Sequence, residues 1–491
     1  MSGAGSAAAA APPAPADRRA LIAVDLGAES CRVSLLRWVE GAPRVELVHR
    51  FLNAPVAGAD GHLRWPLGQI VAGVDDGLRR CAELATEGVR SIAVDGWAVD
   101  YVRLGADGEP LANPFCYRDE RTLAAERVLH ERVSPERMRA ITAVERLRIN
   151  TLYQLVADRQ MELESGERWL NLPEYLLHRW GAEAVAEYTN ATHTQMVEVD
   201  GRRWSGEILR AAGIAAETMP RLVPPGTVLG VMRGPLSELP AFARTELIAP
   251  ACHDTASAVA GIAAEGEDWG YLSSGTWSLV GAVIDEPRNG HAVQLEGFTN
   301  LGGVGESLCF HKNVNGMWLL RQCMAAWEAE GHAWEIGALV AAAESAAVVD
   351  GLIDVDDPEL LLMGGMPERI AAQRLRRGYG EMDLSAEGAP VMALLIFRSL
   401  AARYAEVLRS VERHTGKRLR RLYVVGGGSR NAPLLRLTAE ATGMEVVCGA
   451  AESSTAGNFA VQLAVLEGGA GMGARAFRQE VAGWARVLVA S

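Results

Sequence analysis

The sequence predicts an α/β protein with mainly parallel or mixed sheets, on two observations. Apolar runs that end in Gly-, Asp- or Ser-containing turns alternate along the chain with longer Ala/Leu/Arg-rich segments of helical period, a pattern typical of strands joined by helices. The chain has 491 residues, whereas a single hydrophobic core usually stops growing near about 250–300 residues. We therefore expect two domains.

Four apolar runs supply the clearest strands: ALIAVDLGAES (20–30), RSIAVDGWAVDYVRL (90–104), WGYLSSGTWSLVGAVI (269–284) and RRLYVVGGGSRNAPLL (420–435). Helical periodicity marks 205–213, 335–347 and 390–414. A Pro- and Gly-rich segment, 220–242, divides the chain near its middle. We predict a tail over 1–19, a first domain over 20–247 and a second over 248–491. Both domains begin with a similar strand and turn, which suggests a duplicated architecture.

The composition excludes several classes of protein. A formal net charge of −13 argues against a nucleic-acid or anionic-membrane partner. Seven scattered cysteines without a CxxC pair suit reduced thiols. No run of about 18 apolar residues could span a membrane, and the Ala/Pro-rich residues 1–17 lack the basic and apolar regions of a signal peptide. We expect a cytoplasmic protein with a disordered tail.

The stretch APACHDTASAVAG (249–261) places one carboxylate, Asp254, among small apolar residues with no basic residue to pair with it. Asp254 could cap the helix that follows, a role worth about 1 kcal/mol. Alternatively, it could accept a proton from a substrate hydroxyl, because an alcohol is a poor nucleophile at neutral pH. The small residues behind it would then let a substrate approach. This stretch alone leaves both readings open.

Three turns have the composition of phosphate-binding loops. VDLGAESCR (24–32) exposes backbone N–H groups beside the carboxylate of Asp25, which could hold Mg²⁺. VVGGGSRNAPLL (424–435) follows a strand with glycines and then a helix that Asn431 would cap. SSGTW (273–277) offers hydroxyls. Each could equally be a plain turn, and none has the GxGxxG or GxxxxGK[ST] spacing. Asn313, upstream of a helical face, could be a cap or a ligand.

Taken together, the motifs carry a resemblance to a known family. Their order resembles that of the sugar kinases of the FGGY family, and HDTASAV with TNATHTQ resembles the rhamnulokinase branch; the motifs are VDLGAES, VDGWAVDYVRL, YRDERT, NTLYQL, NLPEYLL, EYTNATHTQM, HDTASAVAG, YLSSGTWSLVG, FTNLGG, KNVNGMWLL and VVGGGSRN. The resemblance covers about residues 20–470. It implies two actin-like ATPase (ribonuclease-H-like) domains with an interdomain cleft, in which the ketose binds mainly to the first domain and ATP mainly to the second.

The resemblance also implies a reaction and its residues. ATP would phosphorylate the 1-hydroxyl of a ketose, L-rhamnulose, with Asp254 as the general base. The implied ketose-binding residues are Trp97, Ala98, Asp100, His253, Thr255 and Asn313. Asp25 would bind Mg²⁺, and the implied nucleotide-binding residues are Ala28, Glu29, Ser30, Cys31, Arg32, Thr276, Arg321, Gly427, Gly428 and Asn431. The partners would be a small-molecule ketose and ATP, in a monomer or homodimer.

The chain departs from the family pattern at Cys31, Gly96, Ala98 and Arg321, where the family usually has Gly, Thr, Gly and Gln. The methyl group of Ala98 would narrow the pocket if it faces the sugar. Another ketose, such as L-fuculose, L-xylulose or ribulose, therefore stays an alternative. A non-catalytic, nucleotide-switched protein of the actin-like fold is a second one, and an NAD-dependent oxidoreductase is disfavoured because no GxGxxG follows a strand.

Overall fold

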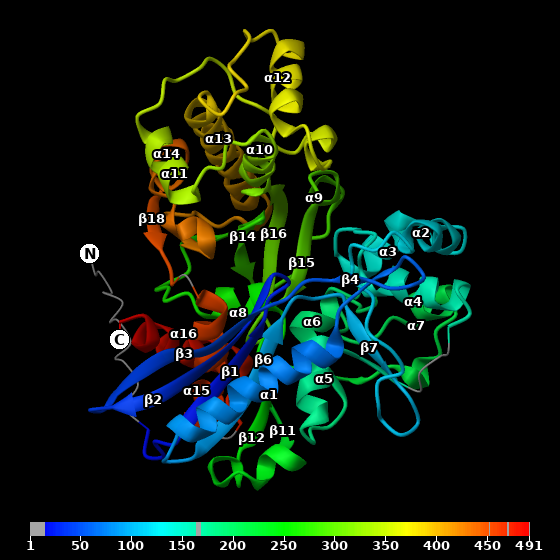
Figure 1. Ribbon diagram of the computed structural model, residues 1–491. Coiled ribbons are helices and arrows are strands. Elements are labelled where there is room, and N and C mark those ends of the chain that lie inside the picture. Colours follow the sequence, from blue (N-terminus) through cyan, green and yellow to red (C-terminus); the bar gives the residue numbers. More distant parts are fainter. Residues whose placement is uncertain (1–14, 164–167, 451, 469–470, 491) are drawn as a thin grey trace, which may run out of the picture. The chain divides into compact units, whose positions relative to one another are not determined.

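The computed structural model describes residues 15–163, 168–450, 452–468 and 471–490 (Figure 1), so most of the expected tail lies outside the described residues. The chain forms two compact units: unit 1 comprises Met1–Glu265, Val283–Cys309 and Ser453–Ser491, and unit 2 comprises Gly266–Ala282 and Phe310–Glu452. The units follow spatial contacts rather than chain order, and the division expected near residue 247 stays a prediction. No described helix combines the length and apolar character that a membrane crossing requires.

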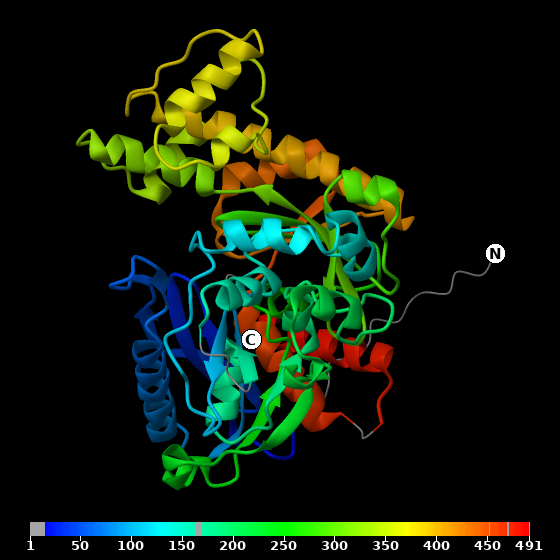
Figure 2. The ribbon, with the colours of Figure 1, turned by 90° about the vertical axis from the view of Figure 1, so that its right-hand side faces the viewer.

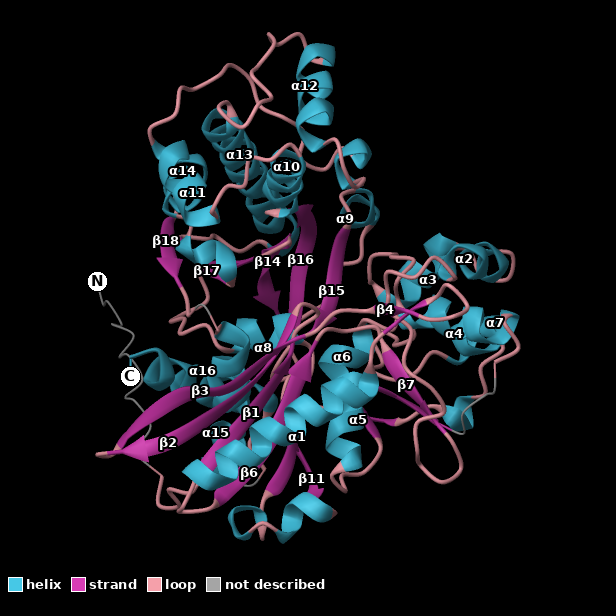
Figure 3. Ribbon diagram, in the orientation of Figure 1, coloured by secondary structure: helices cyan, strands magenta, loops and turns pink. Residues whose placement is uncertain are grey.

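Unit 1 is built on a mixed sheet (Figure 3). Its strands are β1 (Ala20–Leu26), β2 (Ser30–Val39), β3 (Ala42–Leu52), β6 (Val89–Gly96), β11 (Thr227–Val231) and β12 (Glu246–Ala249), in the order β11-β12-β6-β1-β2-β3. β1 pairs antiparallel with β2 and parallel with β6, and β6 pairs parallel with β12. The segment 220–242, expected to divide the chain, contributes β11 and therefore lies inside unit 1.

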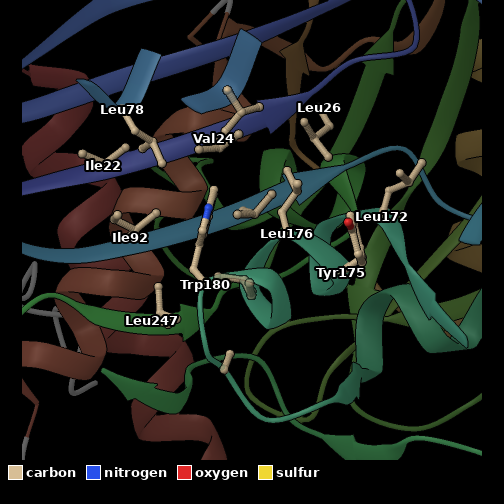
Figure 4. Packing of buried hydrophobic residues seen from close by; sticks show 14 of the residues in the cluster. Ile22, Val24, Leu26, Leu78, Ile92, Leu172, Tyr175, Leu176, Trp180 and Leu247 are labelled. Atoms are coloured by element: carbon tan, nitrogen blue, oxygen red, sulfur yellow. The ribbon is translucent and has the colours of Figure 1, made fainter. Parts of the chain in front are cut away.

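Both faces of this sheet are covered by helices, because β1 alternates its apolar side chains between them. Ile22 and Val24 join the core formed with α1 (Leu67–Leu84) and α5 (Leu172–Arg179), as Figure 4 shows. Leu21 and Ala23 join a second core with α15 (Ser453–Glu467) and α16 (Ala474–Ala490). Asp25, two positions after Ala23 on the same strand, therefore points toward α15.

Unit 2 repeats the strand order of unit 1. Its strands are β13 (Trp269–Ser274), β14 (Trp277–Ile284), β16 (Leu308–Asn315), β17 (Arg421–Val425) and β18 (Glu445–Cys448), in the order β16-β14-β13-β17-β18. β13 pairs antiparallel with β14 and parallel with β17, as β1 does with β2 and β6. This correspondence confirms the α/β fold with mixed sheets and the duplicated architecture. The helices of unit 2, yellow-green to orange in Figure 2, lie over one face of its sheet.

The predicted helices are also confirmed. They are α7 (Gly206–Ala212), α11 (Ile336–Glu344) and α13 (Ala389–Thr415). The other helices of eight residues or more are α2 (Thr122–His130), α3 (Pro135–Thr142), α4 (Thr151–Gln160), α10 (Trp318–Ala329), α12 (Met366–Arg376) and α14 (Ala432–Thr442). The shorter elements are β4 (Val56–Ala57), β5 (Leu63–Arg64), β7 (Tyr101–Leu104), β8 (Arg168–Asn171), β9 (Val185–Glu187), α6 (Tyr188–Thr192), β10 (Arg221–Val223), α8 (Asp254–Ala260), α9 (His291–Leu295) and β15 (Phe298–Gly302).

Candidate active site

Two carboxylates lie side by side near the ends of neighbouring strands in unit 1. Asp25 of β1 and Asp95 of β6 are register partners, and both point toward α15. Ser454 donates to Asp25 Oδ2 at 2.7 Å, and Asn458 Nδ2 donates to Asp95 Oδ2 at 2.6 Å. One helical turn further on, Gln462 Nε2 donates to the carbonyl oxygen of Ile22 at 3.0 Å. The four-residue spacing of these polar groups puts them on one face of α15.

The surroundings of Asp25 and Asp95 fit a hard cation. Arg32 contacts Asp25 Oδ2 at 3.2 Å. Burial, and next the charge of Asp25, raises the pKa of Asp95 well above its ordinary value, and Asp95 Oδ1 is buried without a hydrogen-bond partner among the described residues. The described residues hold no cluster of three His, Cys, Asp or Glu side chains suited to a metal, but Mg²⁺ that arrives with a nucleotide needs only one or two carboxylates.

The predicted phosphate turn connects β1 and β2, and Ala28 and Glu29 form its tip. Gly27 is required there, because a Cβ atom on it would collide with the carbonyl oxygen of Ser30. Cys31 departs from the family pattern, yet its side chain is fully buried in the core and its sulfur lies 3.8 Å from the carbonyl oxygen of Gly27. The thiol therefore does not fill the space above the turn.

Asp254 is the first residue of α8, and His253 occupies the cap position without a side-chain cap hydrogen bond. The reading of Asp254 as a helix cap is therefore wrong. Its Oδ1 lies 3.2 Å from His253 Nε2 and accepts from the hydroxyl of Thr255 at 3.2 Å. Burial raises the pKa of Asp254 to about 6, against the opposing effects of Thr255 and the charge of Arg32. Solvent reaches 37% of the side chain.

The small residues of α8 pack against α15, so the prediction that they admit a substrate is wrong for the buried face of the helix. A Cβ atom on Gly457 would collide with the carbonyl oxygen of Ser257 and lie 2.7 Å from the nitrogen of Gly261. Ser257 Oγ donates to the carbonyl oxygen of Ser454 at 2.9 Å. Because the two helices pack closely, the position of the first turn of α8, which carries Asp254, is fixed.

A buried acidic network holds the turn that carries His253. Glu187 Oε2 accepts from the backbone N–H of Cys252 at 2.8 Å, and the Thr189 hydroxyl accepts from the N–H of His253 at 3.2 Å. Glu174 in turn accepts from the N–H of Glu187 at 3.1 Å. Burial raises the pKa of Glu187 to about 8 and that of Glu174 to about 7. This network explains the NLPEYLL and EYTNATHTQM motifs.

The predicted sugar wall, Trp97 to Asp100, is rigidly held. Asp100 is fully buried, and its Oδ2 accepts from the indole N–H groups of Trp65 at 2.6 Å and Trp97 at 3.0 Å. Its Oδ1 accepts from Gln154 Nε2 at 2.8 Å, and burial raises its pKa to about 6. Val99 has φ +73°, a strained conformation for a β-branched residue, and such strain clusters at functional sites. Ala98 and Trp97 are buried.

The YRDERT motif (117–122) is partly buried: Asp119 and Thr122 are buried, and the side chain of Arg121 is almost fully enclosed. Arg121 Nη1 contacts Asp158 Oδ1 at 2.6 Å, and its guanidinium lies 3.9 Å from the ring centre of Phe115. Arg64 lies 4.3 Å from the same ring centre. The backbone N–H of Tyr117 donates to Asp100 Oδ2 at 3.2 Å, so the motif supports the sugar wall.

Unit 2 carries the remaining predicted residues. Asn431 accepts from the N–H of Leu434 at 3.1 Å and confirms the predicted cap of α14. Gly428 lies in the short turn Gly427–Arg430, where a Cβ atom on it would collide with the Ser274 hydroxyl. Three further predicted residues complete the set, with Thr276 in the β13–β14 turn, Asn313 in β16 and Arg321 in α10. Asn313 lies in a strand, and Met317 occupies the cap of α10, so the capping reading of Asn313 is wrong.

Sequence reasoning missed several residues of unit 1: Asp95 as a site residue, Glu174, Glu187, Thr189, His193, Ser454, Asn458 and Gln462. One signal was available for α15, because Ser454, Asn458 and Gln462 recur every four residues in a helix whose other residues are mostly small or apolar. The acids Glu174 and Glu187 and the histidine at 193 give no periodic signal, since their partners come from distant segments.

Comparisons with known proteins show what this chain is similar to. Residues 20–261 match the profile of the FGGY family of carbohydrate kinases, N-terminal domain, and residues 270–466 match that of its C-terminal domain. The chain is 34% identical to a rhamnulokinase of Bacteroides thetaiotaomicron over 90% of this chain and 89% of that protein. It is 32% identical to a rhamnulokinase of Ligilactobacillus salivarius over 91% and 90%. The fold resembles a ligand-bound xylulose kinase from Lactobacillus acidophilus, with a TM-score of 0.75 and 15% identity over 94% and 91% of the two chains.

Proposed function

Since this chain belongs to the FGGY family of carbohydrate kinases, we propose that it transfers the γ-phosphoryl group of ATP to the 1-hydroxyl of L-rhamnulose. Membership makes it an ATP-dependent sugar kinase with the actin-like fold of two ribonuclease-H-like domains. The choice of L-rhamnulose over L-fuculose, L-xylulose or ribulose is supported by the curated relatives, several of which are rhamnulokinases at 32–34% identity over about 90% of the chain.

The observation that carries the proposed chemistry is the geometry of Asp254. Its carboxylate sits at the start of α8, fixed on one oxygen by His253 and Thr255 and still reached by solvent. A carboxylate that removes the proton as the new O–P bond forms turns the sugar alcohol into an adequate nucleophile. A pKa raised to about 6 keeps this group ionised at neutral pH while making it a stronger base than an ordinary aspartate.

The sugar would contact Trp97, Ala98, His253, Thr255 and Asn313. We propose that Asp100 acts on this wall indirectly, because both of its oxygens already accept hydrogen bonds from side chains that it orients. Two indole rings held by one buried carboxylate give the wall a fixed shape. Such preorganisation is what positions a flexible ketose for attack.

The nucleotide phosphates would meet Ala28, Glu29, Ser30 and Cys31 of the β1–β2 turn and the guanidinium of Arg32 in unit 1. In unit 2, Thr276, Arg321, Gly427, Gly428 and Asn431 would contact ATP. Asp25 would hold Mg²⁺, which when bound neutralises charge on the transferring phosphoryl group. The oxygen-rich, acidic surroundings of Asp25 support this assignment. We further propose a cytoplasmic monomer or homodimer.

The proposed function is tested by supplying ATP, Mg²⁺ and one ketose at a time, and measuring ADP release and the phosphorylated product. We expect L-rhamnulose to give the highest kcat/KM and a product phosphorylated at the 1-hydroxyl. A higher kcat/KM for L-fuculose, L-xylulose or ribulose would make that ketose the substrate in place of L-rhamnulose. The proposed phosphoryl transfer would still hold. ATP binding without turnover of any ketose would instead favour a nucleotide-switched protein.

A further inference from the structure

His193 lies beside the proposed base, although no motif argument assigns it a role. It follows α6 directly and acts as the C-cap residue of this helix. Its Nε2 lies 3.0 Å from Nδ1 of His253, and the two ring centres are 3.8 Å apart with the planes inclined by 50°. His253 Nε2 in turn lies 3.2 Å from Asp254 Oδ1. The three side chains therefore form a continuous chain from α6 to α8.

The backbone of each histidine is fixed independently. Asn150 Nδ2 donates to the carbonyl oxygen of His193 at 2.9 Å. The N–H of His253 donates to the Thr189 hydroxyl at 3.2 Å, and Thr189 is held in turn by Glu187. These hydrogen bonds fix the backbone positions from which the two imidazoles project. Such supported side chains hold their neighbours in productive geometry better than freely rotating ones.

The hydrogen positions follow from the chemistry of the groups. An ionised carboxylate only accepts hydrogen bonds, so His253 Nε2 must carry a hydrogen when Asp254 is ready to act as a base. A single hydrogen then lies between Nδ1 of His253 and Nε2 of His193, bonded to one of the two nitrogens. Burial, and next the charge of His253, lowers the pKa of His193 well below its ordinary value, which keeps His193 neutral. A neutral His193 can therefore contact His253 without placing a positive charge beside it.

We infer that His193 is a positioning residue, which acts through His253 to hold Asp254 Oδ1 and so presents the second carboxylate oxygen to the sugar hydroxyl. Thr255 contacts the same oxygen, Oδ1, at 3.2 Å, so both side-chain contacts fall on one side of the carboxylate. This inference rests on the proposed function, because it gives Asp254 the role of base.

Other ionisable groups surround this chain and could shift its titration. They are Arg32 of β2, Asp95 of β6, Glu174 of α5, Glu187 of β9 and Cys252 in the turn before α8. None of them lies between His193 and His253 in the contacts of the described residues. A change that appears only when the His193 ring is altered can therefore be assigned to this link.

The test compares His193→Leu, which removes the contact, with His193→Gln, whose amide can still meet His253 Nδ1. The control is His178→Gln, because His178 is half-buried in unit 1 and its Nδ1 lies 2.9 Å from the carbonyl oxygen of Ala182. We expect His193→Leu to lower kcat about tenfold, the lower end of the loss seen when an orienting partner is removed. The loss should be larger at pH 6 than at pH 8, because a His253 ring that is no longer held donates more weakly to Asp254, and this raises the pKa of Asp254.

His193→Gln should recover most of the rate, and His178→Gln should match the wild type. The inference is wrong if His193→Leu keeps the wild-type kcat and pH profile, or if a folded His193→Gln protein is as slow as His193→Leu. An independent reading comes from ¹⁵N NMR of the His253 ring without substrate, where His193→Leu should change the hydrogen distribution between Nδ1 and Nε2. An unchanged ring spectrum would overturn the link. Absence of turnover in the wild type would refute the proposed function and leave the NMR result to decide.

Discussion

Asp100 and Asp254 are two carboxyl groups of unit 1 with nearly the same acidity and opposite surroundings. Burial raises the pKa of each to about 6. Asp100 is fully enclosed, and both of its oxygens accept hydrogen bonds from Trp65, Trp97 and Gln154. Asp254 keeps 37% of its side chain exposed, and its side-chain contacts fall on Oδ1.

The difference teaches that a raised pKa does not by itself identify a catalytic base. A base needs an oxygen that a substrate can reach as well as a suitable pKa. Asp100 lacks such an oxygen, and its carboxylate instead fixes two indole rings. Asp254 has one, at the start of a helix whose position is set by close packing. Substitutions of Asp100 and of Asp254 should therefore have different effects on stability and turnover.

The largest effect is expected for Asp254→Asn. An amide cannot accept the sugar proton, so kcat should fall by roughly 10²–10⁴-fold, the usual contribution of a positioned acid or base. Sugar affinity, measured by calorimetry, should change little. Near-normal turnover by Asp254→Asn would show that Asp254 is no more a base than Asp100.

Asp100→Asn should lower the stability of the protein more than its turnover. In either orientation the amide nitrogen would face a donor, the indole N–H groups or Gln154 Nε2, in a fully buried site, and an unsatisfied buried group costs about 1–3 kcal/mol. The free energy of unfolding in urea should fall by that amount, and KM should rise more than kcat falls. If Asp100→Asn were fully stable and as slow as Asp254→Asn, then Asp100 would contact the reacting groups.

Gly457→Ala tests how α8 is positioned. The added Cβ would collide with the carbonyl oxygen of Ser257, and overpacking of this kind costs about 1–3 kcal/mol. The variant should lose stability and also kcat, because α8 carries Asp254. The control is Gly68→Ala in α1, where a Cβ atom meets nothing within 4 Å. Equal stability of the two variants would show that the α8–α15 contact is not tight.

The most specific comparison uses Trp65→Phe, which removes one donor to Asp100. Hydrogen bonds to charged groups contribute about 1.5–3 kcal/mol, in addition to the cost of the smaller ring. Trp484→Phe corrects for that cost, because Trp484 is buried and its N–H has no partner among the described residues. The urea unfolding free energies of the two variants should differ by the hydrogen-bond contribution. Identical values would mean that the Trp65–Asp100 bond adds nothing.

The fold could be predicted from the sequence because it depends on periodic patterns. The strands β1, β6 and β17 are short, apolar and bounded by turns, and the structure confirms each of them. The duplicated strand order was suggested by the similar starts of both halves. The strand β11 within 220–242 was not predicted, because a Pro- and Gly-rich composition suits a loop as well as an edge strand.

The site was predicted less completely, because its partners come from distant parts of the chain. Asp254 could be singled out, since it is one acid in an apolar stretch. The contact between Asp25 and Ser454 joins residues 429 positions apart, and the one between His193 and His253 joins residues 60 apart. Local sequence carries no record of such pairings. The small residues of α8 were misread for the same reason, because their neighbour α15 lies nearly 200 residues away.

The pH dependence of kcat/KM, compared between the wild type and Asp254→Asn, tests the role of Asp254 most directly. A base must be ionised, so activity should fall about tenfold per pH unit below its pKa. We expect the wild type to lose activity below about pH 6, the pKa to which burial raises Asp254. The residual activity of Asp254→Asn should lack this acid limb, whereas an unchanged limb would assign it to another group and contradict the proposed role of Asp254.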